Sequence, residues 1–171
     1  MKKIILPLLL LVCFIANSQE DRRKSSDKNY NELKLNGLAA VAGAFEISFE
    51  RTLNEESAFG VSAFLPFDKD DIGIEYYVSP YYRHYFGKKY AAGFFVEGFG
   101  MLNSTEKRVF IFGTGEYQTD FALGIGFGGK WVSKRGFVAE LNLGFGRNLF
   151  NTDDIENEFI GKVGITFGYR F

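Results

Sequence analysis

The sequence has little of the chemistry on which most enzymes depend. Its 171 residues include one cysteine, Cys13, one histidine, His84, and three prolines. A single histidine excludes a metal site built from several imidazoles. If a leader containing Cys13 is removed, no thiol remains for a disulfide, a nucleophile or a cysteine-ligated metal. We therefore expect no catalytic residues, no metal and no cofactor.

Long apolar runs are also scarce, and the one that is present lies at the start of the chain. Residues 1–3 supply a positive start, residues 4–15 are almost all apolar, and Ala16-Asn17-Ser18 forms a small-x-small cleavage site. This pattern predicts a secretory signal peptide at residues 1–18. A membrane anchor is the alternative interpretation, but the run is short for a spanning helix.

The remaining chain has no excess of positive charge. Loss of Lys2 and Lys3 reduces the 20 basic residues to 18, against 21 acidic ones, which gives a net charge of −3. This balance predicts no nucleic-acid partner. Residues 19–31 are polar, highly charged and without periodicity, so we expect a flexible linker there.

Aromatic residues and glycine, by contrast, are abundant, with 20 Phe, 9 Tyr and 20 Gly. Between residues 121 and 128, Phe, Leu and Ile alternate with Ala and Gly, and the same period of two recurs at 45–50, 141–146 and 163–171. A period of two predicts β-strands. Turn signals divide the rest of the chain into eight segments, at roughly 32–41, 44–51, 57–66, 72–86, 91–103, 118–132, 136–148 and 158–171.

The connections between these segments alternate in length. Three are short, at 52–56, 87–90 and 133–136, and two are longer, at 104–117 and 149–157. Short turns on one side and longer loops on the other are typical of outer-membrane barrels, where the short turns face the periplasm. We predict an all-β fold for residues 32–171, an eight-stranded antiparallel up-and-down transmembrane β-barrel.

The two faces of the strands indicate which side meets lipid. A soluble lipocalin-like barrel, the alternative, would enclose its apolar face. Because an eight-stranded interior is narrow, we expect it to hold glycine and scattered charges, while Phe, Ile and Leu face outward. Aromatic residues near strand ends would then form an interfacial girdle. They are Tyr82, Phe86, Trp131, Phe137, Tyr169 and Phe171.

Charges of both signs fall on the inward face. An isolated buried ion costs several kcal/mol, so we predict a cross-lumen network of ion pairs, densest near the periplasmic end. Its expected role is to fill and rigidify the lumen, with a proton or ion path as the alternative. The predicted members are Glu46, Glu50, Arg83, Glu97, Lys130, Glu140, Lys162 and Arg170, and Lys34 and Glu75 are further inward charges.

Two local features need their own interpretation. Pro80 lies inside the fourth segment although proline cannot donate to a ladder, so we predict a bulge at Ser79-Pro80. The only histidine, His84, is expected to face outward at the interface as a structural residue. A lipid hydrolase would require a serine and an orienting acid near it, and its immediate neighbours in sequence supply neither.

The loops contain one apolar segment and two acidic ones. Val109, Phe110, Ile111 and Phe112 are too apolar for a free loop tip, and we predict that they extend a hairpin, fold over the barrel mouth or bind a partner. They form our candidate interaction loop. The acidic stretches at 68–71 and 153–158 lack EF-hand spacing, so solvated carboxylates are favoured over a calcium site.

The C-terminal run, residues 164–171, resembles the targeting signal of bacterial outer-membrane barrels. Apolar or aromatic residues recur at alternate positions, Ile165, Phe167, Tyr169 and the terminal Phe171. The resemblance implies recognition by the barrel-assembly machinery. Residues 45–51 and 80–86 are similar to segments of an uncharacterised group of small outer-membrane barrels. That group has no established activity and therefore implies no functional residues.

Together these patterns predict a non-enzymatic, monomeric barrel in outer-membrane lipid. It would present surface loops for interaction, with an unspecified partner, or support envelope integrity. The alternatives are a lipid-modifying enzyme of the same architecture and a narrow, porin-like pore.

Overall fold

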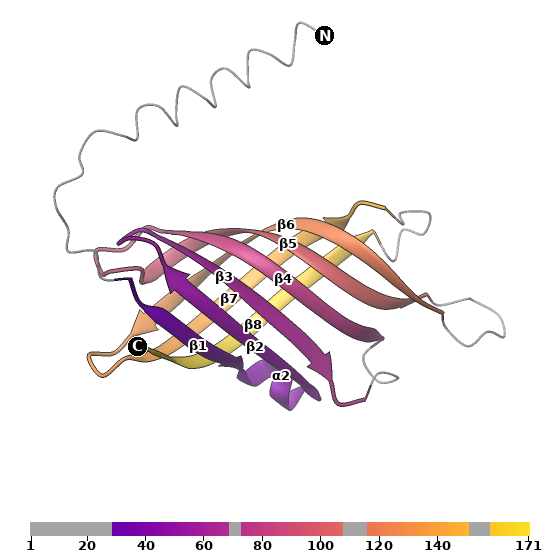
Figure 1. Ribbon diagram of the computed structural model, residues 1–171, viewed down its shortest axis with the longest axis horizontal. Helices are drawn as coiled ribbons and strands as arrows, with labels where there is room; N and C mark the ends of the chain where they lie inside the picture. Colours follow the sequence, from indigo (N-terminus) through magenta and orange to yellow (C-terminus); the bar gives the residue numbers. More distant parts are fainter. Residues whose placement is uncertain (1–28, 69–72, 108–115, 151–157) are drawn as a thin grey trace, which may run out of the picture.

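The computed structural model describes residues 29–68, 73–107, 116–150 and 158–171. They form one closed barrel in which each strand pairs antiparallel with its sequence neighbours and β8 pairs with β1 (Figure 1). This confirms the predicted eight-stranded up-and-down fold. The strands are β1 (Asn31–Asn36), β2 (Ala44–Thr52), β3 (Ser57–Pro66), β4 (Ile74–Tyr85), β5 (Gly93–Lys107), β6 (Glu116–Val132), β7 (Phe137–Asn148) and β8 (Phe159–Arg170).

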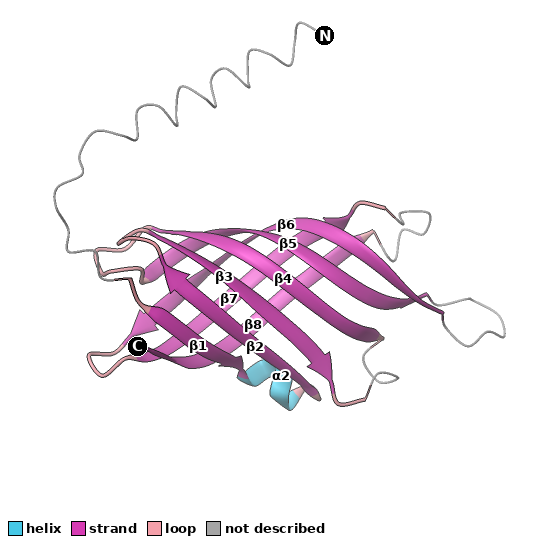
Figure 2. Ribbon diagram, viewed as in Figure 1, coloured by secondary structure: helices cyan, strands magenta, loops and turns pink. Residues whose placement is uncertain are grey.

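The first predicted strand, 32–41, is wrong beyond residue 36, because Gly37–Val41 form the short helix α2 (Figure 2). Asn36 caps this helix, since its side chain accepts hydrogen bonds from the backbone N–H groups of Leu38 and Ala39. Gly43, with φ of 93°, follows the helix in the left-handed region, which favours glycine. These local signals outweigh the alternation of the segment. Among the described residues, no helix is long and apolar enough to cross a membrane.

The predicted bulge at Ser79-Pro80 is also wrong. The ladder between β4 and β5 is interrupted at these two residues, but the pairs Val78↔Leu102 and Tyr81↔Phe99 on either side share one register. Because proline lacks only its N–H group, the strand accommodates Pro80 without inserting a residue. The register of this pair shifts elsewhere, between Ile74 and Tyr76.

The connections β2–β3, β4–β5 and β6–β7 lie at one end of the barrel, which we call the short-turn end, and the other connections lie at the opposite, long-loop end. Both ends of the described chain lie at the short-turn end. There the backbone of Asn31 exchanges two hydrogen bonds with that of Phe171, both of 2.8 Å. At the long-loop end, β5 and β6 extend past their predicted limits to the pair Lys107↔Glu116. Within the predicted 104–117 loop, all of the residues that the structure describes, 104–107 and 116–117, are therefore strand. Val109–Phe112 and most of both acidic stretches lie outside the described residues.

The apolar face of the strands points outward. Every strand exposes apolar side chains, and in the middle of the wall they include Ile47, Val61, Leu102, Ile125, Leu143 and Ile165. All six predicted girdle aromatics are exposed. Phe137 and Tyr169 lie edge to face across β7 and β8, with ring centroids 5.8 Å apart.

The interior contains large aromatic side chains as well as the expected glycine and charge. Tyr81, Tyr85, Phe95 and Phe99 from β4 and β5 are buried in the lumen. Glycines paired with them on the neighbouring strands make room for them. A Cβ atom at Gly124 would lie 2.3 Å from Cζ of Phe99. The narrow bore is thus filled by large residues that lie beside glycines of the adjacent strands.

Candidate functional site

The carboxylate of Glu50 on β2 is fully buried in the lumen and has the most polar contacts there. It accepts from Nζ of Lys34 at 2.7 Å, from Nη1 of Arg83 at 2.9 Å and from Nζ of Lys130. Two tyrosine hydroxyls complete its shell, those of Tyr81 at 3.1 Å and Tyr85 at 2.8 Å. Three cations from three different strands therefore converge on one carboxylate.

Further ion pairs link strands that are not neighbours in the barrel. Nζ of Lys34 lies 2.7 Å from Oε2 of Glu140 on β7, and Nη1 of Arg83 on β4 lies 2.5 Å from Oε1 of the same carboxylate. Nε of Arg83 donates to Glu97 at 2.8 Å, and Nζ of Lys162 donates to Glu97 at 3.3 Å. Side chains of β1, β4, β5, β7 and β8 thus form a continuous bridge.

The network continues to the short-turn end through Glu32 on β1. Its Oε2 accepts from Nζ of Lys130 at 2.9 Å, and its Oε1 accepts from Nε of Arg170 at 2.7 Å. The other guanidinium nitrogens of Arg170 donate to the backbone carbonyls of Tyr90 and Ala91, at 3.0 and 2.9 Å. Arg170 therefore fastens the β4–β5 turn beneath the lumen.

We call this set the lumen network. It has five cations, Lys34, Arg83, Lys130, Lys162 and Arg170, and four carboxylates, Glu32, Glu50, Glu97 and Glu140. Every side chain is at most 9% exposed. Removal of water from each ion costs several kcal/mol, and only good geometry with additional hydrogen bonds compensates for it. Each carboxylate of the network meets at least two cations.

Aromatic rings supply a further contact for the cations. The guanidinium of Arg83 lies between the rings of Tyr81 and Phe95, 4.4 and 4.2 Å from their centroids. Nζ of Lys130 lies 4.6 Å from the centroid of Tyr85. Cation–π attraction is strongest where both groups are shielded from water. These rings were not among the predicted site residues, although Tyr81 and Tyr85 share the strand face of Arg83.

The structure brings together seven of the eight residues predicted for the network and separates Glu46. Glu46 is buried and accepts from Nδ2 of Asn36 at 2.6 Å, and no ion pair among the described residues joins it to the network. Glu75 is half-buried near the long-loop end and accepts from Oγ of Ser104 at 3.0 Å. Glu32, the second residue of β1, was not predicted, although it shares the inward parity of Lys34.

His84 is exposed on the outer wall and packs edge to face on Phe86, with ring centroids 4.9 Å apart. Ser57 is its partner in the β3–β4 ladder, but no hydrogen bond between the two side chains occurs in the described structure. The contacts of His84 are those of an interfacial side chain. Within the described ranges, no three His, Cys, Asp or Glu side chains gather as a metal site.

The four residues of the predicted C-terminal signal, Ile165, Phe167, Tyr169 and Phe171, are all exposed. The first three lie on the outer face of β8, and Phe171 follows the strand. The candidate interaction loop, residues 109–112, lies outside the described residues.

A closed eight-stranded barrel with an apolar exterior and a polar interior has the architecture of outer-membrane barrels. No protein-family model and no curated protein matches the chain. The structure is similar to the N-terminal β-barrel domain of OprF from Pseudomonas aeruginosa, with a TM-score of 0.61, 16% identity, and coverage of 85% of this chain and 98% of that one. It also matches the outer membrane protein Ail of Yersinia pestis in a phospholipid bilayer nanodisc, with a TM-score of 0.41, 14% identity, and coverage of 84% and 100%. At such identities the likeness to OprF concerns the fold alone.

Proposed function

We propose that residues 19–171, after removal of the signal peptide, form a non-enzymatic monomeric barrel in the outer membrane. Its lumen is sealed by the lumen network, and it acts through the loops at its long-loop end or by supporting the envelope. The observation that carries this proposal is the set of ion pairs that join opposite walls of the lumen.

The exterior supports insertion into lipid. Side chains such as Ile125, Phe145 and Phe159 are 72, 65 and 66% exposed. Apolar surface in water costs about 25 cal/mol per Å², and soluble monomers rarely expose large contiguous apolar patches. A bilayer removes this cost for the whole outer wall. The girdle at the short-turn end fits one membrane interface.

The interior supports a closed lumen rather than a pore. A conducting path would require water and ions to pass Arg83, Glu140 and Lys34, whose charged groups are already in contact at 2.5 to 2.7 Å. Separating them would expose unpaired charges in a narrow, aromatic-lined bore. The network therefore favours filling and rigidity over transport. The C-terminal signal would direct the chain to the barrel-assembly machinery.

Location is tested by fractionation of cells that express the full chain. We expect the mature protein in the outer-membrane fraction, with gel migration that changes on heating because the barrel resists detergent until boiled. Intact-mass measurement should give a chain that begins at Gln19. A soluble protein whose migration is unaffected by heat would refute the membrane assignment.

Closure of the lumen is tested in planar bilayers. We expect the purified, folded barrel to give no steady conductance at moderate voltage, while a porin reconstituted in the same bilayers gives stepwise currents. Folding is verified beforehand by heat-modifiable migration of the same sample. Reproducible conductance steps from the folded barrel would refute the sealed lumen and favour the pore.

A further inference from the structure

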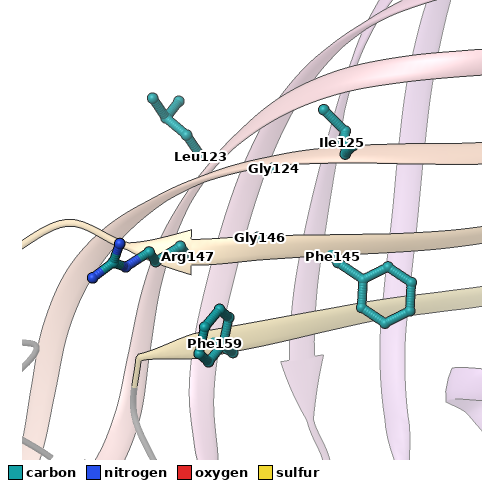
Figure 3. Close-up of a pocket in the computed structure, with 7 residues that line it drawn as sticks. All are labelled: Leu123, Gly124, Ile125, Phe145, Gly146, Arg147 and Phe159. Atoms are coloured by element: carbon teal, nitrogen blue, oxygen red, sulfur yellow. The ribbon is translucent and has the colours of Figure 1, made fainter. Parts of the chain in front are cut away.

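A groove lies on the outer wall near the long-loop end, across β6, β7 and β8 (Figure 3). Its floor is where Gly124 of β6 pairs with Gly146 of β7. Apolar side chains, among them Ile125, Phe145 and Phe159, and the side chain of Arg147 stand around this floor. We call this feature the outer groove. It differs from the lumen network because it faces away from the barrel interior.

The position of Arg147 along β7 places it at the membrane surface. It lies ten positions after Phe137, which belongs to the girdle at the opposite end of the same strand. With a rise of about 3.4 Å per residue and a tilt of roughly 40°, these residues span about 25 Å, the height of the apolar band of such barrels. If Phe137 lies at one interface, Arg147 therefore lies at the headgroups of the other leaflet.

The guanidinium of Arg147 is available to a ligand. Its side chain is 62% exposed, and its Nη2 lies 2.5 Å from Oε1 of Glu158. A guanidinium has five N–H donors, so this contact orients the group and leaves donors for a second anion. In the part of the outer wall whose side chains are described, it is the one exposed cation at the long-loop end.

We propose that the outer groove binds a lipid of the outer leaflet that carries a phosphorylated headgroup. An acyl chain lies over the Gly124–Gly146 floor beside Ile125 and Phe145, and a phosphate oxygen accepts from Arg147. Arginine matches phosphate geometry in a way that a point charge does not. The inference rests on the proposed insertion into the outer membrane, which makes lipid the neighbour of this surface.

A second copy of the chain fits the groove less well. A two-fold contact across the same patch would bring the two copies of Arg147 together. Each copy of Glu158 already pairs with the Arg147 of its own chain, so the guanidinium groups would gain no new counter-charge. A phosphorylated lipid supplies both the apolar chain and the negative charge.

The experiment measures lipid binding by native mass spectrometry of the folded mature barrel in a neutral detergent. The probe is a bis-phosphorylated glycolipid with several acyl chains, compared with the same glycolipid after removal of its phosphates. Arg147→Gln removes the cation. The matched control is Arg51→Gln, which removes an exposed arginine of β2 at the short-turn end.

We expect the wild-type barrel to prefer the phosphorylated lipid, and Arg147→Gln to weaken its binding about tenfold while binding of the phosphate-free lipid stays unchanged. Arg51→Gln should bind as the wild type does. Equal affinity for the two lipids, an equal loss in both variants, or a lipid-free dimer abolished by Arg147→Gln would each overturn the inference. Heat-modifiable migration of every variant separates these outcomes from failure of the barrel to insert.

Discussion

Replacement of Glu50 by alanine is expected to destabilise the barrel by about 3–5 kcal/mol, the usual cost of leaving buried charges without a partner. The substitution removes the one carboxylate that Lys34, Arg83 and Lys130 share. Lys34 and Arg83 keep Glu140, and Lys130 keeps Glu32. The cations nevertheless remain crowded in a water-poor lumen with one negative charge fewer.

The measurement is reversible urea unfolding of the barrel in lipid vesicles, followed by the loss of heat-modifiable migration. Glu56→Ala is the matched control, because Glu56 lies exposed in the β2–β3 turn, and its free energy of unfolding should change by less than about 0.5 kcal/mol. Glu50→Gln should fall between the two, since its amide keeps the shape and one acceptor. A loss below about 1 kcal/mol for Glu50→Ala would show that the lumen network contributes little to stability.

Replacement of Gly124 by alanine is expected to cost about 1–3 kcal/mol, although it adds one methyl group. The new Cβ would lie 2.3 Å from Cζ of Phe99 and 2.6 Å from the backbone oxygen of Phe145. The ring can move only into space already taken by other lumen side chains, and the backbone oxygen belongs to the β7 ladder. Both strands must therefore shift.

Gly98→Ala is the control for this substitution. Gly98 lies on the outer face of β5, and a Cβ there would have no atom within 4 Å, so its stability should stay within about 0.5 kcal/mol of the wild type. Combining Gly124→Ala with Phe99→Leu should recover part of the loss, because the ring contact is relieved while the backbone contact remains. Equal unfolding midpoints for Gly124→Ala and Gly98→Ala would contradict the proposed fit between glycine and aromatic rings.

Sequence reasoning was most reliable where one pattern repeats along a whole strand. The alternation at 121–128 and 163–171 marks β6 and β8, and their glycines identify the inner face, because bulky residues on both faces would not fit a narrow bore. It failed where a local interaction competes with the pattern. The cap made by Asn36 ends β1 and starts α2, and Pro80 is accommodated by an interrupted ladder rather than a bulge.

The candidate site shows the same division. Parity along each strand assigned Glu50, Arg83, Lys130 and Glu140 to the lumen, because neighbouring residues of a strand point to opposite faces. This alternation does not indicate which of the inward charged side chains form ion pairs with one another. Glu46 has the same parity as Glu50, yet the structure places it beside Asn36 and away from the cations.

By itself, then, the sequence determined the strand count, the closed topology and the outward direction of the apolar face. These follow from a period of two and from the volume of side chains on each face. Only the tertiary structure decided which charges meet, that tyrosines complete the shell of Glu50, and that Arg147 borders a groove on the outer wall. Such contacts depend on the stagger between strands, which brings together residues as distant in the chain as Lys34 and Glu140 and which no single strand encodes.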